Sequence, residues 1–188
     1  MILLFIIVLL ISMMPMYHHP KIISNFITLE ECSYIKRKVS DKLKPSTVSI
    51  GSTLNESVRK SETAWLEKTD PVVRRIIEKC GPIENCEKLQ VIRYTHGGFY
   101  KPHQDVLKCP NPRIHTFILA LNDDYIGGGT EFTNLGKTYH LKIGDALSFD
   151  TLDTYGMVTS KALHGGKPVE TGEKWICNVW VHKFNYSI

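Results

Sequence analysis

The chain is organised around the stretch Tyr94-Thr95-His96-Gly97-Gly98-Phe99-Tyr100-Lys101-Pro102-His103-Gln104-Asp105. Within it, His103 and Asp105 stand two positions apart. Because side chains alternate between the two faces of an extended segment, both point to the same side. A neutral imidazole beside a carboxylate is a pair of ligands for a divalent metal ion of the first transition row. Taken alone, the pattern is more typical of a surface loop, so the metal interpretation needs a third ligand.

The candidate third ligand is His164, in the segment Ala162-Leu163-His164-Gly165-Gly166-Lys167-Pro168-Val169. Two histidines and one carboxylate form the facial triad that holds Fe(II) in non-haem oxygenases. The chain contains 8 histidines, so one suitable histidine is weak support by itself. Lys174 strengthens the hypothesis, because it opens the last predicted strand and faces inward with Ile176 and Trp180. A buried lysine needs an anion, and a dicarboxylate cosubstrate would provide one.

The composition is that of one globular domain. The 188 residues are 43% hydrophobic, which suffices for a single core. Lysine and arginine exceed aspartate and glutamate by 23 to 19, and this net charge of +4 is too small and too scattered to indicate a nucleic-acid partner. A mildly basic groove for a peptide is compatible with it.

Two helices are predicted in the first half of the chain. Thr28 and Glu31 match a capping box, which begins a helix that we expect to run to about residue 43. Asp70 and Pro71 begin a second helix, which Gly81 ends. Residues 45–60 are predicted to form a loop between them. The apolar face of the first helix is expected to contain Leu29, Cys32, Ile35 and Val39.

Beyond residue 82, short alternating segments separated by glycines indicate β-strands. The candidate strands are residues 89–95, 114–121, 138–142, 145–149 and 174–183. Such a series predicts a closed or double-sheet β structure with the two helices packed outside it. The expected fold class is therefore α+β.

The five cysteines do not show the paired spacing of a structural zinc site. Cys80 and Cys86 are close enough in sequence to form a local disulfide in an oxidising compartment. The same spacing also arises by chance, so the disulfide state stays open.

Residues 1–17 are predicted to be a hydrophobic N-terminal anchor or signal segment that precedes a folded domain of residues 20–188. Only Ser12 and Pro15 interrupt the apolar run. At ~1.5 Å per residue, a helix of this length falls short of the ~30 Å hydrocarbon core of a bilayer. No basic start or small-residue cleavage site is visible, which favours an uncleaved anchor. The nearby positive charges all follow the segment, which favours a domain on the cytosolic side.

Four motifs follow one another through the second half of the chain. They are Tyr94-x5-Tyr100-x-Pro102-His103-x-Asp105, Gly128-Gly129-Thr130-Glu131-Phe132, Leu163-His164-x3-Pro168-Val169-x2-Gly172-x-Lys174-Trp175, and Trp180-x-His182. In this order and spacing they resemble the prolyl 4-hydroxylase family of Fe(II)/2-oxoglutarate dioxygenases, and the resemblance extends over residues 20–182. It implies a double-stranded β-helix, or jelly roll, with flanking N-terminal helices, in agreement with the predicted strands.

The resemblance also implies roles for individual residues. It makes His103, Asp105 and His164 the iron ligands and places Lys174 against the far carboxylate of 2-oxoglutarate. Tyr94 and Thr116 match positions that add hydrogen bonds to the cosubstrate. Positions that line the peptide groove are matched by Arg59, Tyr100, Trp180 and His182, although Tyr100 and Trp180 fit equally well as core aromatic residues.

The activity implied is that of a peptidyl-prolyl 4-hydroxylase, which uses Fe(II), 2-oxoglutarate and O2, with ascorbate as reductant. Its expected substrates are proline-rich or collagen-like peptides, whose polyproline II conformation is ordered before binding. The nearest alternative is a lysyl hydroxylase, although that family has arginine where this chain has Lys174. Another 2-oxoglutarate dioxygenase, or a jelly-roll binding module without catalysis, completes the set.

Two features depart from the family pattern. Residues 150–160 match no family motif, and the loop after Asp105 is short. Family members with an N-terminal hydrophobic segment often work in the secretory lumen, which favours a lumenal domain at the membrane of the endoplasmic reticulum. The charge asymmetry favours the cytosolic face instead, and the oligomeric state stays open.

Overall fold

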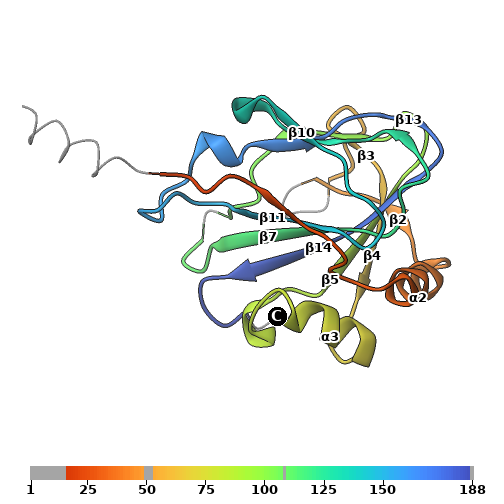
Figure 1. The fold of residues 1–188 in the computed structure, drawn as a ribbon, viewed down its shortest axis with the longest axis horizontal. Coiled ribbons are helices and arrows are strands. Elements are labelled where there is room, and N and C mark those ends of the chain that lie inside the picture. Colours follow the sequence, from red (N-terminus) through yellow and green to blue (C-terminus); the bar gives the residue numbers. More distant parts are fainter. Residues whose placement is uncertain (1–15, 49–52, 108, 187–188) are drawn as a thin grey trace, which may run out of the picture.

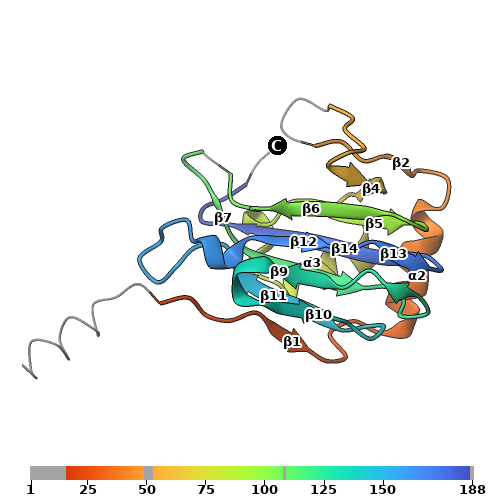
Figure 2. The same cartoon turned by 90° about the horizontal axis from the view of Figure 1, so that it is seen from above.

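The computed structural model describes residues 16–48, 53–107 and 109–186. Two β-sheets face one another and two helices cover one side of the larger sheet (Figures 1 and 2). This architecture confirms the predicted α+β class with a jelly-roll core. The helices are α2 (Leu29–Val39) and α3 (Pro71–Glu78).

The larger sheet has seven strands and the smaller has five. In spatial order, the larger sheet contains β1 (Lys21–Ile23), β11 (Ala146–Asp150), β7 (Arg113–Ala120), β14 (Lys174–His182), β5 (Leu89–Tyr94), β4 (Glu62–Leu66) and β2 (Lys44–Pro45). The smaller sheet contains β10 (Lys137–Tyr139), β9 (Thr130–Phe132), β12 (His164–Gly166), β6 (Phe99–His103) and β3 (Arg59–Lys60). A further antiparallel pair joins β13 (Val169–Thr171) to β8 (Ile126–Gly127).

The capping box at the start of α2 is confirmed. The Thr28 hydroxyl accepts the Glu31 backbone N–H at 3.1 Å, and the Glu31 carboxylate accepts the Thr28 N–H at 3.0 Å. The helix ends at Val39, earlier than predicted, because Pro45 forces the residue before it into an extended conformation and the chain there pairs with β4. Leu29 was predicted on the buried face but is 58% exposed.

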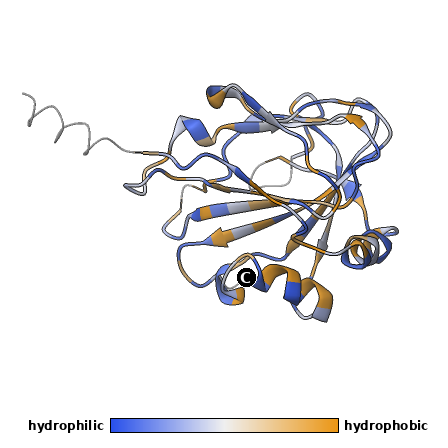
Figure 3. Cartoon of the chain, in the orientation of Figure 1, coloured by the Kyte–Doolittle hydropathy of each residue, from blue (hydrophilic) through white to orange (hydrophobic). Residues whose placement is uncertain are grey.

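The larger sheet separates two hydrophobic clusters. Along β14, Trp175 and Cys177 face the helices, whereas Ile176 faces the space between the sheets. On the helix side, Ile76 of α3 is fully buried, and Figure 3 shows the alternation of apolar and polar residues along this helix. The alternation along β14 therefore sends Lys174 into the interior between the sheets, as predicted.

Several short strands were not predicted. Residues 59–66, at the end of the predicted loop and beyond it, form β3 and β4, and the strand predicted at residues 138–142 is reduced to Lys137–Tyr139. Strands of two or three residues show no alternation that a sequence pattern can detect. The predicted strands of the larger sheet agree with β5, β7, β11 and β14 to within two residues at each end.

The five cysteines are free thiols, so Cys80 and Cys86 form no disulfide in this structure. Within the described residues, no helix has both the length and the apolar character needed to cross a bilayer. The anchor predicted at residues 1–17 falls almost entirely on residues 1–15, which lie outside the described part of the chain.

The N-cap of α3 provides a stability test. Asp70 accepts the N–H groups of Val72 and Val73 and the hydroxyl of Tyr34, and it pairs with Lys38 at 3.1 Å. We expect Asp70→Ala to lower the free energy of unfolding by about 1–2 kcal/mol at pH 7, measured by urea denaturation. Asp70→Asn is the control, because an asparagine still caps the helix, and equal midpoints for Asp70→Ala and the natural chain would contradict the prediction.

The same contribution is expected to depend on pH. Burial alone would raise the pKa of Asp70, but hydrogen bonds from Tyr34, the Val73 N–H and Lys38 outweigh it and lower the pKa to about 2. A carboxyl group with a depressed folded-state pKa stabilises the fold above its unfolded value and loses that contribution as pH falls. The difference between the natural chain and Asp70→Ala should therefore shrink between about pH 4 and the folded-state pKa.

Candidate functional site

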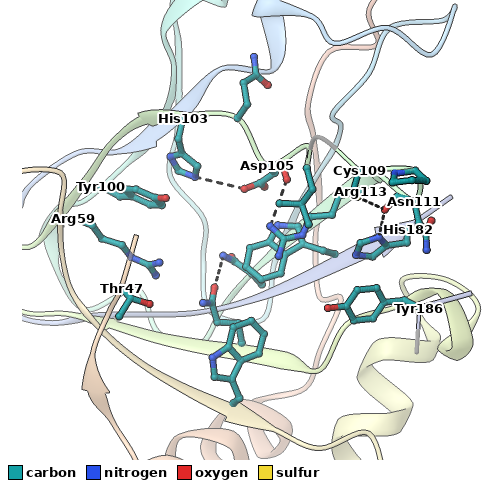
Figure 4. A pocket seen from close by; sticks show the side chains of 17 residues that line it. Thr47, Arg59, Tyr100, His103, Asp105, Cys109, Asn111, Arg113, His182 and Tyr186 are labelled. Atoms are coloured by element: carbon teal, nitrogen blue, oxygen red, sulfur yellow. Dashed lines mark hydrogen bonds and ion pairs between the residues drawn. The ribbon is translucent and has the colours of Figure 1, made fainter. Parts of the chain in front are cut away.

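The three predicted ligands meet at the edge of the smaller sheet. His103 ends β6 and His164 begins β12, and these two strands pair so that the histidines are direct partners. Asp105 follows β6 by two residues. One nitrogen of each histidine and one oxygen of Asp105 all lie within 4.8 Å of one another. Figure 4 shows His103 and Asp105 pointing toward each other.

Hydrogen bonds orient both imidazole rings. The Nδ1 atom of His103 lies 2.9 Å from the Lys101 carbonyl, and that of His164 lies 3.0 Å from the Ala162 carbonyl. A bond from Nδ1–H to a carbonyl leaves Nε2 with a free lone pair, which is the usual arrangement of metal-binding histidines. The two Nε2 atoms lie 3.6 and 3.7 Å from the oxygens of Asp105.

The electrostatics of the triad suit a cation. Burial lowers the pKa of His164 to about 4, so its ring is neutral at pH 7. Burial alone would raise the pKa of the Asp105 carboxyl, but His164 and His103 hold it well below its usual range. Two neutral imidazoles and one carboxylate are the donor set of non-haem Fe(II) sites. The residues present therefore fit an iron ion.

Glycine next to the third ligand permits the close approach of the two strands. A Cβ atom at Gly165 would lie 2.8 Å from the Tyr100 carbonyl oxygen and 3.0 Å from the Pro102 nitrogen. Any larger residue would push β12 away from β6 and carry His164 away from His103.

Lys174 lies buried between the sheets beside Tyr94. The two residues are partners in the β14–β5 ladder, and Lys174 is 5% exposed. Its Nζ donates to the Gly128 carbonyl at 2.6 Å, and among the described residues it has no carboxylate partner. Burial lowers its pKa to about 8. A buried cation without an anion fits the distal carboxylate of a dicarboxylic acid.

The two other residues predicted to bind the cosubstrate have different surroundings. Tyr94 is 5% exposed and belongs to the cluster between the sheets. The Thr116 hydroxyl donates to Asp105 at 2.8 Å, so in this structure it supports a predicted ligand. Such a contact fixes the orientation of the carboxylate. Hydrogen bonds from Tyr94 and Thr116 to a cosubstrate stay predictions.

All four predicted peptide-groove residues line one cavity of about 650 Å³, which also reaches His103 and Asp105 (Figure 4). The Tyr100 ring stacks on His103 with 3.7 Å between centroids, and the Arg59 guanidinium lies 4.7 Å from the Tyr100 ring centroid. Trp180 lines the same cavity. The sequence left Tyr100 and Trp180 open as core residues, and the structure places both at the cavity wall.

His182 is held differently from the other three. It is 1% exposed, and its ring nitrogens contact the Glu87 carboxylate at 2.8 Å and the Asn111 carbonyl at 2.7 Å. Both nitrogens are therefore occupied, and the ring cannot hydrogen-bond to a ligand without losing a partner. His182 fixes this end of the cavity.

The sequence analysis missed two residues of this cluster. Arg113 donates to Glu87, with one contact of 2.9 Å, and its guanidinium lies 3.8 Å from the Trp180 ring centroid. Arg113 also reaches the Asp105 carbonyl at 3.4 Å. Arg113 is at the start of a predicted strand and Glu87 is in a loop, and no local pattern links them. Only the inward position of Arg113 within its strand offered a signal.

Removing the charge of Glu87 should weaken the fold. Glu87→Gln is expected to cost about 1.5–3 kcal/mol in the free energy of unfolding, because hydrogen bonds to two buried charged groups lose strength. Glu87 is 5% exposed and contacts both Arg113 and His182. Urea denaturation measures the change, and Glu84→Gln, at a nearby exposed position, is the control. A Glu87→Gln variant as stable as this control would contradict the interpretation.

Comparison with known proteins relates this site to others. Residues 89–182 match the model of the 2OG-Fe(II) oxygenase superfamily. The chain is 33% identical to a putative prolyl 4-hydroxylase of Acanthamoeba polyphaga mimivirus, over 91% of this chain and 77% of that protein. It is 32% identical to prolyl 4-hydroxylase 1 of Arabidopsis thaliana, over 86% of this chain and 68% of that protein.

Solved structures show the same fold. A viral collagen prolyl hydroxylase from Paramecium Bursaria Chlorella virus-1, solved as its 2OG complex, superposes with a TM-score of 0.73. It is 26% identical, and the match covers 89% of this chain and 97% of that one. A prolyl 4-hydroxylase of Pseudomonas putida has the same fold with a TM-score of 0.64 at 17% identity, covering 89% of this chain and 94% of that one. The chain belongs to the prolyl 4-hydroxylase family of the 2OG-Fe(II) oxygenase superfamily.

Proposed function

We propose that the protein is a peptidyl-prolyl 4-hydroxylase. It takes Fe(II), 2-oxoglutarate and O2, places one oxygen atom on a proline of a peptide and the other in succinate, and releases CO2. The observation that carries this proposal is the juxtaposition of the His103–Asp105–His164 triad with the cavity that reaches it, backed by the buried and unpaired Lys174. Iron together with 2-oxoglutarate supplies the oxidising chemistry.

The chain's own residues divide the work between two sides of the triad. His103, Asp105 and His164 hold the ion on one face and leave the opposite face open. Lys174 fixes the distal carboxylate of the cosubstrate, with Tyr94 beside it at the ladder position opposite. The cosubstrate is thereby oriented before oxygen enters the site.

The cavity wall supplies the peptide side. Tyr100 and Trp180 present aromatic surface, and Arg59 and Arg113 lie over these two rings. Aromatic grooves bind extended proline-rich segments, because the polyproline II helix is ordered in advance. Similarity to a viral collagen prolyl hydroxylase supports a proline-rich or collagen-like substrate.

The test is succinate release from the full chain with Fe(II), 2-oxoglutarate and proline-rich peptides, combined with mass spectrometry of the peptide. We expect one added oxygen on proline and a matching amount of succinate. Lysine-containing collagen-like peptides without proline at the target position test the lysyl hydroxylase alternative. No succinate with any peptide, and none in its absence, would reject the enzymatic function in favour of a binding module.

Three further expectations stay predictions. Ascorbate as the reductant, attachment to a membrane through residues 1–17, and a lumenal site at the endoplasmic reticulum are not tested by the described residues. Protease protection of the domain in sealed membrane vesicles distinguishes the lumenal from the cytosolic side.

A further inference from the structure

An apolar surface lies where the described chain begins. Four side chains there are more than half exposed: Met16 at 64%, Tyr155 at 57%, Met157 at 64% and Val158 at 59%. The last three belong to the loop between β11 and the turn Ser160–Ala162, in the region that matched no family motif. In Figures 1 and 2 this loop and the start of the chain lie together at one end of the molecule. We call residues 155–158 and Met16 the apolar tip.

The loop is an ordered turn that holds these side chains outward. The Asp153 carboxylate accepts the N–H groups of Tyr155 and Met157, and the Asp153 N–H donates to the Met157 carbonyl at 2.8 Å. Gly156 supplies the turn with a φ of +74°. Val158 forms an isolated bridge with Leu152. The exposure of the apolar side chains is therefore built into the backbone of the turn.

Met16 is fastened to the same loop. Its N–H donates to the Thr154 hydroxyl at 3.0 Å, and its carbonyl accepts the Thr154 N–H at 2.9 Å. The Tyr17 hydroxyl donates to the Asp150 carbonyl at 2.9 Å, and Tyr17 is 7% exposed. No free linker separates the domain from residues 1–15, which carry no charged side chain.

We propose that the apolar tip inserts into the surface of the lipid bilayer that receives residues 1–15. A segment that enters a bilayer directly before Met16 brings the loop to the membrane surface, since Met16 and Thr154 are bonded to each other. Tyrosine and long apolar side chains are suited to the interface between headgroups and acyl chains. Contiguous exposed apolar side chains on a soluble face mark such contact sites.

Insertion of the tip would orient the catalytic cavity. The Gln104 amide donates to the Thr159 carbonyl at 2.9 Å, which ties the end of the loop to the residue between His103 and Asp105. A tip held at the bilayer therefore keeps the triad close to the membrane surface. This inference goes beyond the proposed function and does not depend on the identity of the peptide.

Fluorescence quenching tests the insertion. The full chain carrying Met157→Trp is reconstituted in phosphatidylcholine vesicles with brominated acyl chains. Ile126→Trp is the matched control, because Ile126 is 60% exposed and lies in β8, away from the tip. We expect several-fold stronger lipid quenching for Met157→Trp than for the control. Trp65, Trp175 and Trp180 are present in both variants and cancel in the comparison.

Equal quenching of the two variants would overturn the inference. It would also be overturned if the fluorescence of Met157→Trp responded to a proline-rich peptide and not to the lipid, since the loop would then be a substrate contact. Succinate release by the same samples keeps the two proposals separate. Normal turnover without lipid quenching rejects only the insertion, and lipid quenching without turnover rejects only the hydroxylase.

Discussion

The His164→Ala variant is expected to lose more than about 100-fold in Fe(II) affinity and in turnover, because changes outside the ligand set already cost 10–100-fold. The ring is 4% exposed and packs against Phe132 and Phe149, with ring centroids 5.3 and 4.7 Å away. Two ligands then remain, and no other side chain of the described residues completes the cluster. Iron titration without oxygen and succinate release measure the two losses.

The matched control is His96→Ala. His96 is exposed and contacts only the Glu170 carbonyl, at 2.8 Å, so its loss should leave iron binding unchanged. Removing a buried ring also leaves a void, and circular dichroism with urea denaturation separates loss of folding from loss of metal. A folded His164→Ala protein that binds iron as tightly as the His96→Ala control would show that the third ligand is misassigned.

The ligand set illustrates what a sequence can and cannot specify. His103 and Asp105 are two residues apart, so strand alternation alone placed them on one side. His164 is brought back by the pairing of β12 with β6, which no local pattern encodes, and its assignment came from the motif around it. Strands as short as β9 and β12 have too few residues to show a period.

The helices and the larger sheet were predictable because their signals are local. Thr28 and Asp70 cap the helices through their own next turns. The long strands β7 and β14 show the enrichment in apolar and β-branched residues that buried strands require. The cluster of Glu87, Arg113 and His182 was not predictable, because its partners meet only after the sheet has formed.

Lys174→Met is expected to weaken 2-oxoglutarate binding by about 30- to 5,000-fold, which corresponds to 2–5 kcal/mol for losing one partner of a buried charge pair. The only hydrogen bond of its ammonium within the described chain is to the Gly128 carbonyl, at 2.6 Å. Since the charge is uncompensated before the cosubstrate binds, the variant should be at least as stable as the natural chain. Lys137→Met, at an exposed position, is the control.

The pH dependence gives this prediction a sign. Burial lowers the pKa of Lys174 to about 8, whereas an unfolded lysine titrates near 10.4. Between these values the unfolded state holds more protons, so the stability of the natural chain should rise with pH, and Lys174→Met should remove that rise. Binding of the dicarboxylate requires the ammonium form and should weaken above about pH 8 in the natural chain alone. Calorimetric titration of the iron-loaded protein with 2-oxoglutarate, without oxygen, measures both effects on affinity. Equal affinities for Lys174→Met and Lys137→Met at pH 7 would place the distal carboxylate elsewhere.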